Sequence, residues 1–407
     1  MRTLVMMCKR FFNILFLTAF FTSPMQAQEA PGRVLNGIDA LRELNFTPLA
    51  GKRVGLITNH TGLALDGVST IDLLSQTDVC KLTALFSPEH GIRGDVDEKV
   101  NSSVDKVTGL PVYSLYGETR RPTREMLRNL DALVFDIQDI GTRFYTYIST
   151  MAYAMEEAAK AGMPFYVLDR LNPIGGVKIE GPMLDADRTS FTGYMPMPVR
   201  HGMTVGELAR YFNVEKRIGV KLEVIAVKGW RRTHMFWDTG QLWVNPSPNM
   251  RSVTAAILYP GVGLLESANI SVGRGTEKPF ELVGAPWIQP GRFAELLREA
   301  RLPGIEFVPL YFTPDASRHK DLRCGGVNLV ITDPEKLDSV SLGMTMVSVL
   351  RKLYPAEFTI DRVIDLLGND EYMQILKNGK TPTEENLKNN SAFLNFIKAR
   401  QSVLIYD

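Results

Sequence analysis

Residues 82–94, LTALFSPEHGIRG, decide the fold class of this chain. The apolar run Leu82–Phe86 predicts a buried strand, and the proline that follows it predicts a tight loop that presents Glu89 and His90. In open parallel α/β sheets, chemistry takes place outside the carboxyl ends of the strands, where such loops converge. We therefore expect the loop at Glu89 to be the centre of a functional site.

Three further apolar runs end in the same way. We predict strands at 54–57, 132–135 and 165–168, with helices between them. Alternating strands and helices predict right-handed βαβ units and a parallel sheet, whose polar strand ends meet at one edge. The residues expected at this edge are Asn59, His60, Glu89, His90, Asp136, Gln138, Asp139, Arg143, Asp169, Arg170 and Asn172. Four polar clusters at four strand ends exceed what packing requires, so we predict a single crevice that contains a site.

The second half of the chain predicts a smaller unit. Residues 204–207, TVGE, form a capping box that begins a helix, and residues 245–250, NPSPNM, predict a hinge or domain junction. Beyond the junction we expect helices near 292–300, 339–353 and 360–367 and a strand near 326–331. The prediction is an α/β protein with a doubly wound domain at 31–250 and an α+β domain at 251–407.

The first 27 residues have the pattern of a signal peptide. Lys9 and Arg10 form a basic region, Phe11–Phe21 an apolar region, and Met25–Ala27 a plausible cleavage site. The apolar region is short for a membrane span and runs into Pro24. We expect an exported protein, periplasmic or secreted, with no stable membrane anchor after cleavage.

Composition and motifs exclude several classes of partner. Removal of Arg2, Lys9 and Arg10 with the signal changes the formal net charge from +1 to −2, which favours neither nucleic acid nor anionic membrane. Cys80 and Cys324 then remain, and we predict buried thiols, although an oxidising compartment leaves a disulfide open. The sequence has no P-loop, no GxGxxG after the first strand and no HExxH, so we expect neither a cofactor nor a metal.

The strand ends supply the groups that acid/base bond cleavage needs. Glu89 is our candidate acid, because a short proline-flanked loop beside apolar sequence would raise its pKa by partial desolvation. Asp136 and Asp139 could lie across the cleft as the second group. Taken singly, however, Asp136 and Asp169 are more often turn formers or helix caps. Tyr145 could stack on a sugar or simply pack.

At these residues the chain resembles the NamZ-type exo-β-N-acetylmuramidases. The resemblance runs from Val34 to the C-terminus. The matching stretches are ITNHTG (57–62), FSPEHGIRG (86–94), FDIQDIGTRFYTYI (135–148), LDRLNPIGG (168–176), EGPML (180–184), VRHGMTVGEL (199–208), NPSPNM (245–250) and SVGRGTEKPFE (271–281).

The resemblance implies a Rossmann-like N-terminal domain, a smaller C-terminal domain and an active-site cleft between them. It implies release of a non-reducing terminal N-acetylmuramic acid (MurNAc) from peptidoglycan fragments such as MurNAc-GlcNAc in cell-wall turnover and recycling. Glu89 matches the glutamate regarded as catalytic in the family.

The lactyl carboxylate of MurNAc suits a guanidinium group, and the candidates in the matching stretches are Arg143, Arg170, Arg200 and Arg274. An aspartate such as Asp136 or Asp139 would orient the 2-acetamido group in a substrate-assisted reaction, so retaining, inverting and substrate-assisted hydrolysis all stay open. The expected substrate-binding residues are Asn59, His60, His90, Gln138, Arg143, Tyr145, Asp169, Arg170, Asn172, Arg200, His201, Arg274 and Glu277.

Two other functions compete with hydrolysis. The same scaffold would serve a non-catalytic muropeptide-binding protein, because a fold alone does not imply catalysis. A less favoured alternative is an esterase or acyltransferase that uses Ser103, since Ser103–Lys106 matches the SxxK pattern but lacks its SDN and KTG partners.

Overall fold

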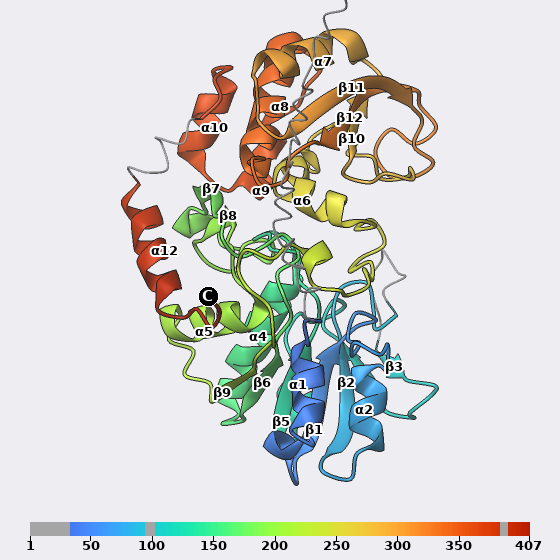
Figure 1. Cartoon of the computed structure of the whole chain (residues 1–407), viewed down its shortest axis with the longest axis vertical. Coiled ribbons are helices and arrows are strands. Elements are labelled where there is room, and N and C mark those ends of the chain that lie inside the picture. Colours follow the sequence, from blue (N-terminus) through green and yellow to red (C-terminus); the bar gives the residue numbers. More distant parts are fainter. Residues whose placement is uncertain (1–32, 94–101, 383–389) are drawn as a thin grey trace, which may run out of the picture.

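The computed structural model describes residues 33–93, 102–382 and 390–407 (Figure 1). The predicted signal peptide at 1–27 lies outside the described residues. A larger sheet, drawn in blue to green, occupies the lower half of Figure 1. A smaller sheet lies in the upper half beside α7 (Pro290–Glu299) and α8 (Ser339–Leu353).

The larger sheet confirms the predicted α/β, doubly wound fold. Its strand order is β3-β4-β2-β1-β5-β6-β9, and every neighbouring pair is parallel except β3 with β4. The chain moves from β1 to one side and then returns to build the other side from β5, so the order reverses between β1 and β5. The bounds are β1 (Arg53–Thr58), β2 (Lys81–Ser87), β3 (Ser103–Val104), β4 (Pro111–Ser114), β5 (Ala132–Asp136), β6 (Phe165–Leu168) and β9 (Leu222–Ile225).

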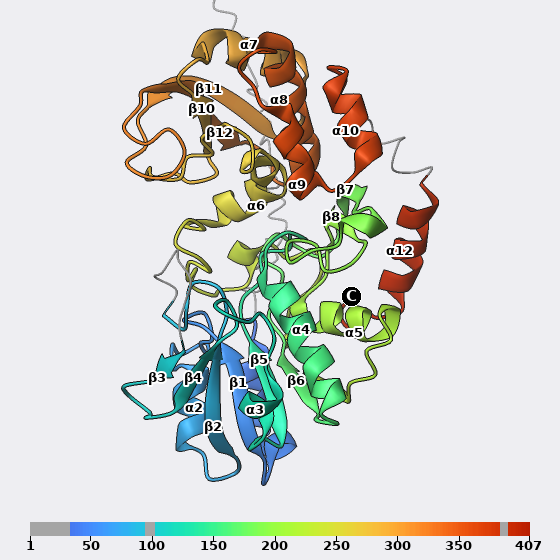
Figure 2. The same ribbon diagram turned by 180° about the vertical axis from the view of Figure 1, so that it is seen from behind.

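Helices cover both faces of this sheet, which explains why β5 is buried along its whole length. Leu56 packs with α1 (Gly37–Glu43) and α2 (Thr70–Gln76), which lie in front of the sheet in Figure 1. The next residue, Ile57, belongs to the core on the opposite face, which Figure 2 shows from behind. That face carries α3 (Arg124–Leu127), α4 (Tyr147–Lys160) and α5 (Val205–Glu215).

The smaller sheet is antiparallel, in the order β10-β12-β11, and helices pack against it. The part of the chain that forms this sheet contains the predicted helices near 292–300, 339–353 and 360–367 and the predicted strand near 326–331. The remaining bounds are α6 (Val253–Val262), β10 (Leu282–Ala285), β11 (Ile305–Phe312), β12 (Cys324–Ile331), α9 (Ile364–Leu367), α10 (Asp370–Lys377) and α12 (Ser391–Gln401), with 3₁₀ segments at Thr47–Leu49, Ala186–Arg188, Phe236–Asp238, Gly263–Leu265 and Ile360–Val363.

Two features join the two sheets. One hydrophobic core continues from α4 and α5 into α6 and α8 without interruption. A two-stranded ribbon, β7 (Glu180–Met183) with β8 (Pro198–Arg200), packs against α8 and α12. From α12 the chain returns to the larger sheet, where the Tyr406 hydroxyl donates to Asp169 Oδ2 at 2.5 Å. The predicted second domain, 251–407, therefore ends on the first.

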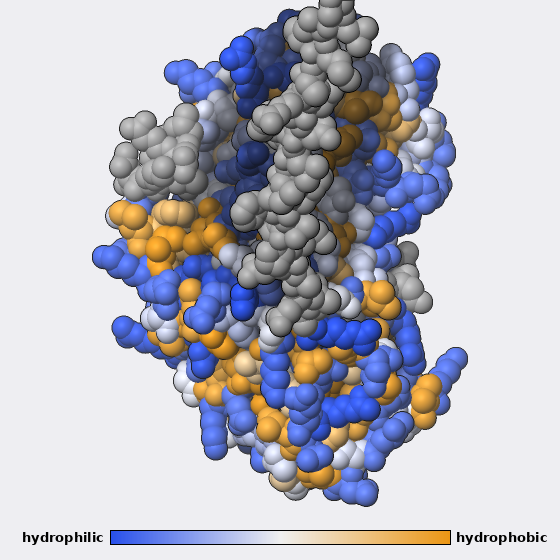
Figure 3. Space-filling model, in the orientation of Figure 1, coloured by the Kyte–Doolittle hydropathy of each residue, from blue (hydrophilic) through white to orange (hydrophobic). Residues whose placement is uncertain are grey.

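One face of the molecule has mixed polarity (Figure 3), and Cys80 and Cys324 do not form a disulfide. The face seen in Figure 3 mixes hydrophilic and hydrophobic residues. Among the described residues, no helix combines the length and the apolar character needed to cross a bilayer. Cys80 and Cys324 are buried free thiols, as predicted, and burial raises the pKa of Cys324 to about 11.

Candidate active site

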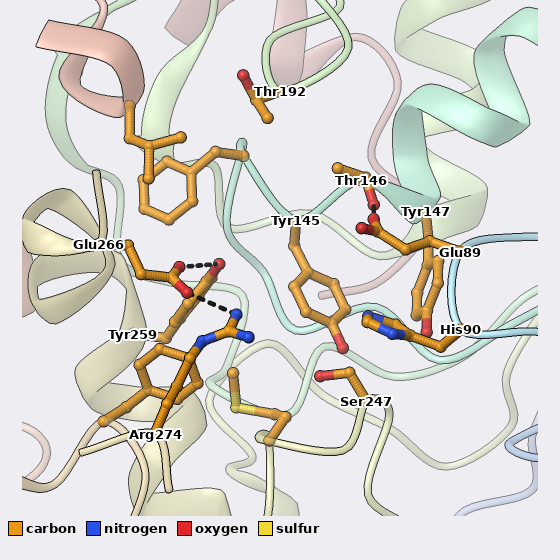
Figure 4. A pocket seen from close by; sticks show the side chains of 14 residues that line it. Glu89, His90, Tyr145, Thr146, Tyr147, Thr192, Ser247, Tyr259, Glu266 and Arg274 are labelled. Carbon is orange, nitrogen blue, oxygen red and sulfur yellow. Dashed lines mark hydrogen bonds and ion pairs between the residues drawn. The ribbon is translucent and has the colours of Figure 1, made fainter. Parts of the chain in front are cut away.

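A cavity of about 300 Å³ lies where the two sheets meet, and Glu89 lines it (Figure 4). Its walls come from the loop after β2, the segment that leads from β5 into α4, the loop before β8, the predicted junction at 245–250, α6 and the residues that follow it, and α9. The lining residues are Glu89, His90, Phe144, Tyr145, Thr146, Tyr147, Thr192, Ser247, Met250, Tyr259, Glu266, Arg274, Phe280 and Leu366.

A sharp turn at the end of β2 presents Glu89. His90 and Gly91 both have positive φ, 69° and 78°, so the chain turns abruptly after the carboxylate. Glu89 is half-buried, and the hydroxyl of Thr146 donates to its Oε2 through a short hydrogen bond. Thr146 is the N-cap residue of α4. The structure thus places Glu89 in a cavity at the carboxyl end of β2.

Three tyrosines form the wall beside Glu89. The rings of Tyr145 and Tyr147 lie 5.1 Å apart edge to face, and Tyr145 contacts Tyr259 in the same way at 5.9 Å. The hydroxyl of Tyr147 donates to the carbonyl of Pro246 at 2.6 Å, which ties α4 to the junction segment. Burial raises the pKa of all three hydroxyls above the ordinary value of 10, so they remain protonated donors at neutral pH.

An ion pair faces this wall from the C-terminal part of the chain. Arg274 Nη2 lies 2.5 Å from Glu266 Oε1, and the Tyr259 hydroxyl donates to Glu266 Oε2 at 3.2 Å. The Arg274 guanidinium lies 5.6 Å from the centre of the Phe280 ring. Arg274 was predicted, whereas Glu266 was missed because it follows a helix rather than a strand.

The expected single crevice is in fact divided. Thr61, Gln138 and Arg170 line a separate cavity of about 350 Å³ at the ends of β1, β5 and β6. His60 lines neither of these cavities. Its Nε2 contacts the carbonyl of Asn245 at 2.6 Å and so holds the junction segment whose Ser247 lines the first cavity. Of the predicted residues, Glu89, His90, Tyr145 and Arg274 line the first cavity.

Asp136 and Asp139, the expected partners of Glu89, do not line this cavity. Asp136 is fully buried, and Arg170 Nε donates to its Oδ1 at 2.5 Å. Asp139 accepts from the backbone N–H of Gly141 at 2.7 Å, and its Oδ2 lies 3.7 Å from Nε2 of the buried His201. The structure places Glu266, not either aspartate, in the cavity with Glu89.

Arg143 and Arg200 are buried and make structural contacts with other groups of the protein. The Arg143 guanidinium donates to the carbonyls of Leu366 and Leu367 at 2.6 and 2.8 Å, and burial lowers its pKa to about 9. Arg200 pairs with the buried Glu180 at 2.6 Å. Neither residue lines the cavity that contains Glu89.

The remaining predicted residues have local partners. The Asn172 side-chain amide donates to the carbonyl of Met203 at 3.0 Å, and Asn59 Oδ1 accepts from the backbone N–H of Thr61 at 2.9 Å. Asp169 accepts from the Thr204 hydroxyl at 2.8 Å, below the N-terminus of α5. The side chain of Glu277 is fully exposed. Within the described residues, no group of three His, Cys, Asp or Glu side chains has the arrangement of a metal site.

Comparisons with known proteins agree with this architecture. The family model of the N-terminal domain of exo-β-N-acetylmuramidase NamZ matches residues 54–254, and the model of its C-terminal domain matches residues 257–406. The chain is 46% identical over 400 residues to the peptidoglycan β-N-acetylmuramidase NamZ of Bacillus subtilis, covering 96% of both chains.

Solved structures give the same result. The chain is similar to two crystal structures of DUF1343 family proteins from Bacteroides fragilis, at TM-scores of 0.80 and 0.75 and identities of 38% and 29%. Each alignment covers 92% of this chain and 99% of the solved one. The two family models together account for both sheets and for the cavity between them. This chain therefore belongs to the exo-β-N-acetylmuramidase NamZ family.

Proposed function

We propose that this protein is an exo-acting glycoside hydrolase that releases N-acetylmuramic acid from the non-reducing end of peptidoglycan fragments such as MurNAc-GlcNAc. The observation that carries the proposal is the position of Glu89, a half-buried carboxylate in a cavity at the carboxyl edge of a doubly wound sheet. Membership of the NamZ family and the activity named for the Bacillus subtilis relative support the same substrate.

Glu89 acts as the general acid. Thr146 donates to one carboxylate oxygen, which fixes the group at the start of α4 and orients the other oxygen for proton transfer. During cleavage Glu89 gives its proton to the bridging oxygen, which leaves with the electron pair of the broken bond. A water molecule then adds to the anomeric carbon and returns a proton to Glu89, so the reaction is a balanced hydrolysis.

Arg274 recognises the lactyl carboxylate of the muramyl sugar. Of the four arginines expected to do so, Arg143, Arg170 and Arg200 are buried against carbonyls or carboxylates of the protein. Arg274 is the one that lines the cavity of Glu89. The planar guanidinium matches a carboxylate with two parallel hydrogen bonds, which suits the lactyl group.

The enzyme works outside the cytoplasm, in the periplasm or the medium. The basic and apolar regions of residues 1–27 support export by a cleaved signal peptide. The N-terminal sequence of the protein recovered from its producing cells tests this location: a mature chain that begins near Gln28 is expected, and one that retains Met1 contradicts it.

Hydrolysis of aryl β-MurNAc and of MurNAc-GlcNAc by wild type and Glu89→Gln tests the function. Wild type should release MurNAc from both substrates, and the variant should lose roughly 100- to 10,000-fold in rate on the disaccharide. The loss should be smaller on the aryl glycoside, because an activated leaving group needs less protonation. Glu299→Gln, an exposed glutamate of α7, is the matched control and should equal wild type.

A stable, uncleaved complex of wild type with MurNAc-GlcNAc would instead identify a muropeptide-binding protein. Labelling by a serine-directed phosphonate would favour the esterase alternative, although Ser103 lies exposed in β3 at the edge of the sheet and does not line the cavity. Full activity of Glu89→Gln on MurNAc-GlcNAc would remove Glu89 from the mechanism.

A further inference from the structure

Glu266 lines the cavity of Glu89 from the other part of the chain. It comes directly after the 3₁₀ segment Gly263–Leu265, and it is the second glutamate of the cavity. Figure 4 shows the two carboxylates approaching the cavity from different elements, with Tyr145 between them in this view. Among the described residues that line this cavity, Glu89 and Glu266 are the only acidic ones.

The backbone brings Glu266 close to the strand-end segment that holds the opposite wall. A side chain at Gly263 would meet the ring of Phe144, since a Cβ there would lie 2.6 Å from Phe144 Cε2. The ring of Phe144 also contacts Tyr259 edge to face at 5.3 Å. This close approach fixes the distance between the segment of Glu266 and the segment of Tyr145 to Tyr147.

The surroundings of the two glutamates differ in charge. Glu266 meets a cation and a hydroxyl, because Arg274 pairs with Oε1 and Tyr259 donates to Oε2. The hydrogen bond described for Glu89 comes from an uncharged hydroxyl, that of Thr146. The ion pair with Arg274 suits Glu266 to the role of a charge stabiliser and leaves the role of general acid to Glu89.

The charges of Glu89 and Glu266 both affect the pKa of the Tyr259 hydroxyl. Burial raises the pKa of Tyr259 most strongly, the charge of Glu266 adds to the increase, and the charge of Glu89 contributes in the same direction. The two carboxylates are therefore near enough to the Tyr259 hydroxyl for both fields to reach it.

We propose that Glu266 is the second catalytic carboxylate of this protein, held by Arg274 and Tyr259 as the anion that faces the anomeric carbon while Glu89 protonates the leaving oxygen. This assignment rests on the proposed function. It replaces Asp136 and Asp139, which are engaged elsewhere. Glu266 forms no bond in the step already described: it balances the positive charge that develops on the sugar as the glycosidic bond breaks.

Glu266→Gln distinguishes this role from that of Glu89. The positive charge develops with any leaving group, so the variant should lose roughly 100- to 10,000-fold in kcat on both MurNAc-GlcNAc and aryl β-MurNAc. Glu89→Gln should show a large loss on the disaccharide and a smaller one on the aryl glycoside. A structural defect would also lower the rate on both substrates, so the melting temperature and the affinity for free MurNAc separate the two explanations.

Three controls make the result decisive. Glu299→Gln should match wild type, Glu266→Gln should keep the wild-type melting temperature within a few degrees, and its affinity for free MurNAc should change less than tenfold. If Glu266→Gln unfolds, Glu266→Asp replaces it and should retain the charge with a smaller loss in kcat. Wild-type hydrolysis with less than a tenfold loss in Glu266→Gln overturns the role of Glu266 alone, whereas no hydrolysis by wild type overturns the proposed function.

Discussion

Glu89, proposed as the acid, and Arg274, proposed to recognise the substrate, come from different parts of the chain. Glu89 lies in the turn that follows β2, while Arg274 lies between two glycines of positive φ, Gly273 and Gly275. A Cβ on Gly275 would lie 2.4 Å from the backbone nitrogen of Ala316, so only glycine allows that approach. The position of the guanidinium is thus set by backbone packing.

Replacement of Arg274 by lysine should reduce discrimination between sugars. The lysine keeps the charge but loses the planar fork that binds a carboxylate with two parallel hydrogen bonds. We expect kcat/KM on aryl β-MurNAc to fall roughly 10- to 100-fold, the equivalent of one charge-assisted hydrogen bond, while the low rate on aryl β-GlcNAc, which lacks the lactyl group, stays the same. Arg292→Lys on the exposed side of α7 is the control; an equal loss on both sugars would show that Arg274 acts through Glu266 or through the fold and not on the lactyl group.

Whether the sequence could predict a residue's position depended on how far away in the sequence its partners lie. Glu89 was predicted because an apolar strand, a proline and a carboxylate are adjacent in sequence. Arg143 was expected to bind substrate, yet its partners include the carbonyls of Met197, Leu366 and Leu367, more than fifty residues away. Nothing near Arg143 in the sequence shows that these carbonyls would surround it, and the same holds for Glu266.

At the scale of elements, α6 and α8 cross at a pair of glycines, and this crossing supports the site. A Cβ on Gly261 of α6 would lie 1.7 Å from the carbonyl oxygen of Ser339, and one on Gly343 of α8 would lie 2.3 Å from the carbonyl oxygen of Gly261. Tyr259 belongs to the same helix as Gly261, and Glu266 follows it. The strands and helices of the larger sheet were predictable from their periodicity, but this contact depends on two glycines far apart in sequence.

Gly261→Ala should separate α6 from α8 and disturb Glu266. Overpacking of a core contact costs typically 1–3 kcal/mol of unfolding free energy, and we expect at least that loss in urea denaturation together with reduced hydrolysis. Gly291→Ala on α7 is the matched control, because a Cβ there meets nothing within 4 Å. The control should be neutral or more stable by about 0.4–1 kcal/mol. Equal stability of both variants would show that the crossing tolerates a side chain.

At the scale of the whole molecule, the sequence did not indicate that the chain returns from the smaller sheet to the larger one. The doubly wound sheet followed from the strand spacing, and a junction was expected at 245–250. The last residues nevertheless lie on the first sheet, where Ile405 N–H donates to Glu207 Oε1 at 2.8 Å and the backbone N–H of Val227 donates to the Tyr406 hydroxyl at 2.8 Å. No local pattern in 391–407 identifies these partners, because they are almost two hundred residues away.

Asp169, which accepts from Tyr406 at this junction, should make the stability of the molecule depend on pH. Burial raises the pKa of its carboxyl from the ordinary 3.8 to about 7. The folded protein therefore holds this proton where the unfolded chain has lost it, so the stabilisation is complete below about pH 4 and disappears as the pH rises through about 7. Asp169→Asn cannot titrate, so its stability relative to wild type, measured as the free energy of unfolding, should increase by roughly 1–4 kcal/mol between pH 4.5 and 7.5, at about 1.4 kcal/mol per pKa unit. Urea denaturation of both proteins at three pH values measures this change, with the exposed Asp187→Asn as control; a difference that stays constant with pH would mean that Asp169 is ionised in the folded protein throughout this range.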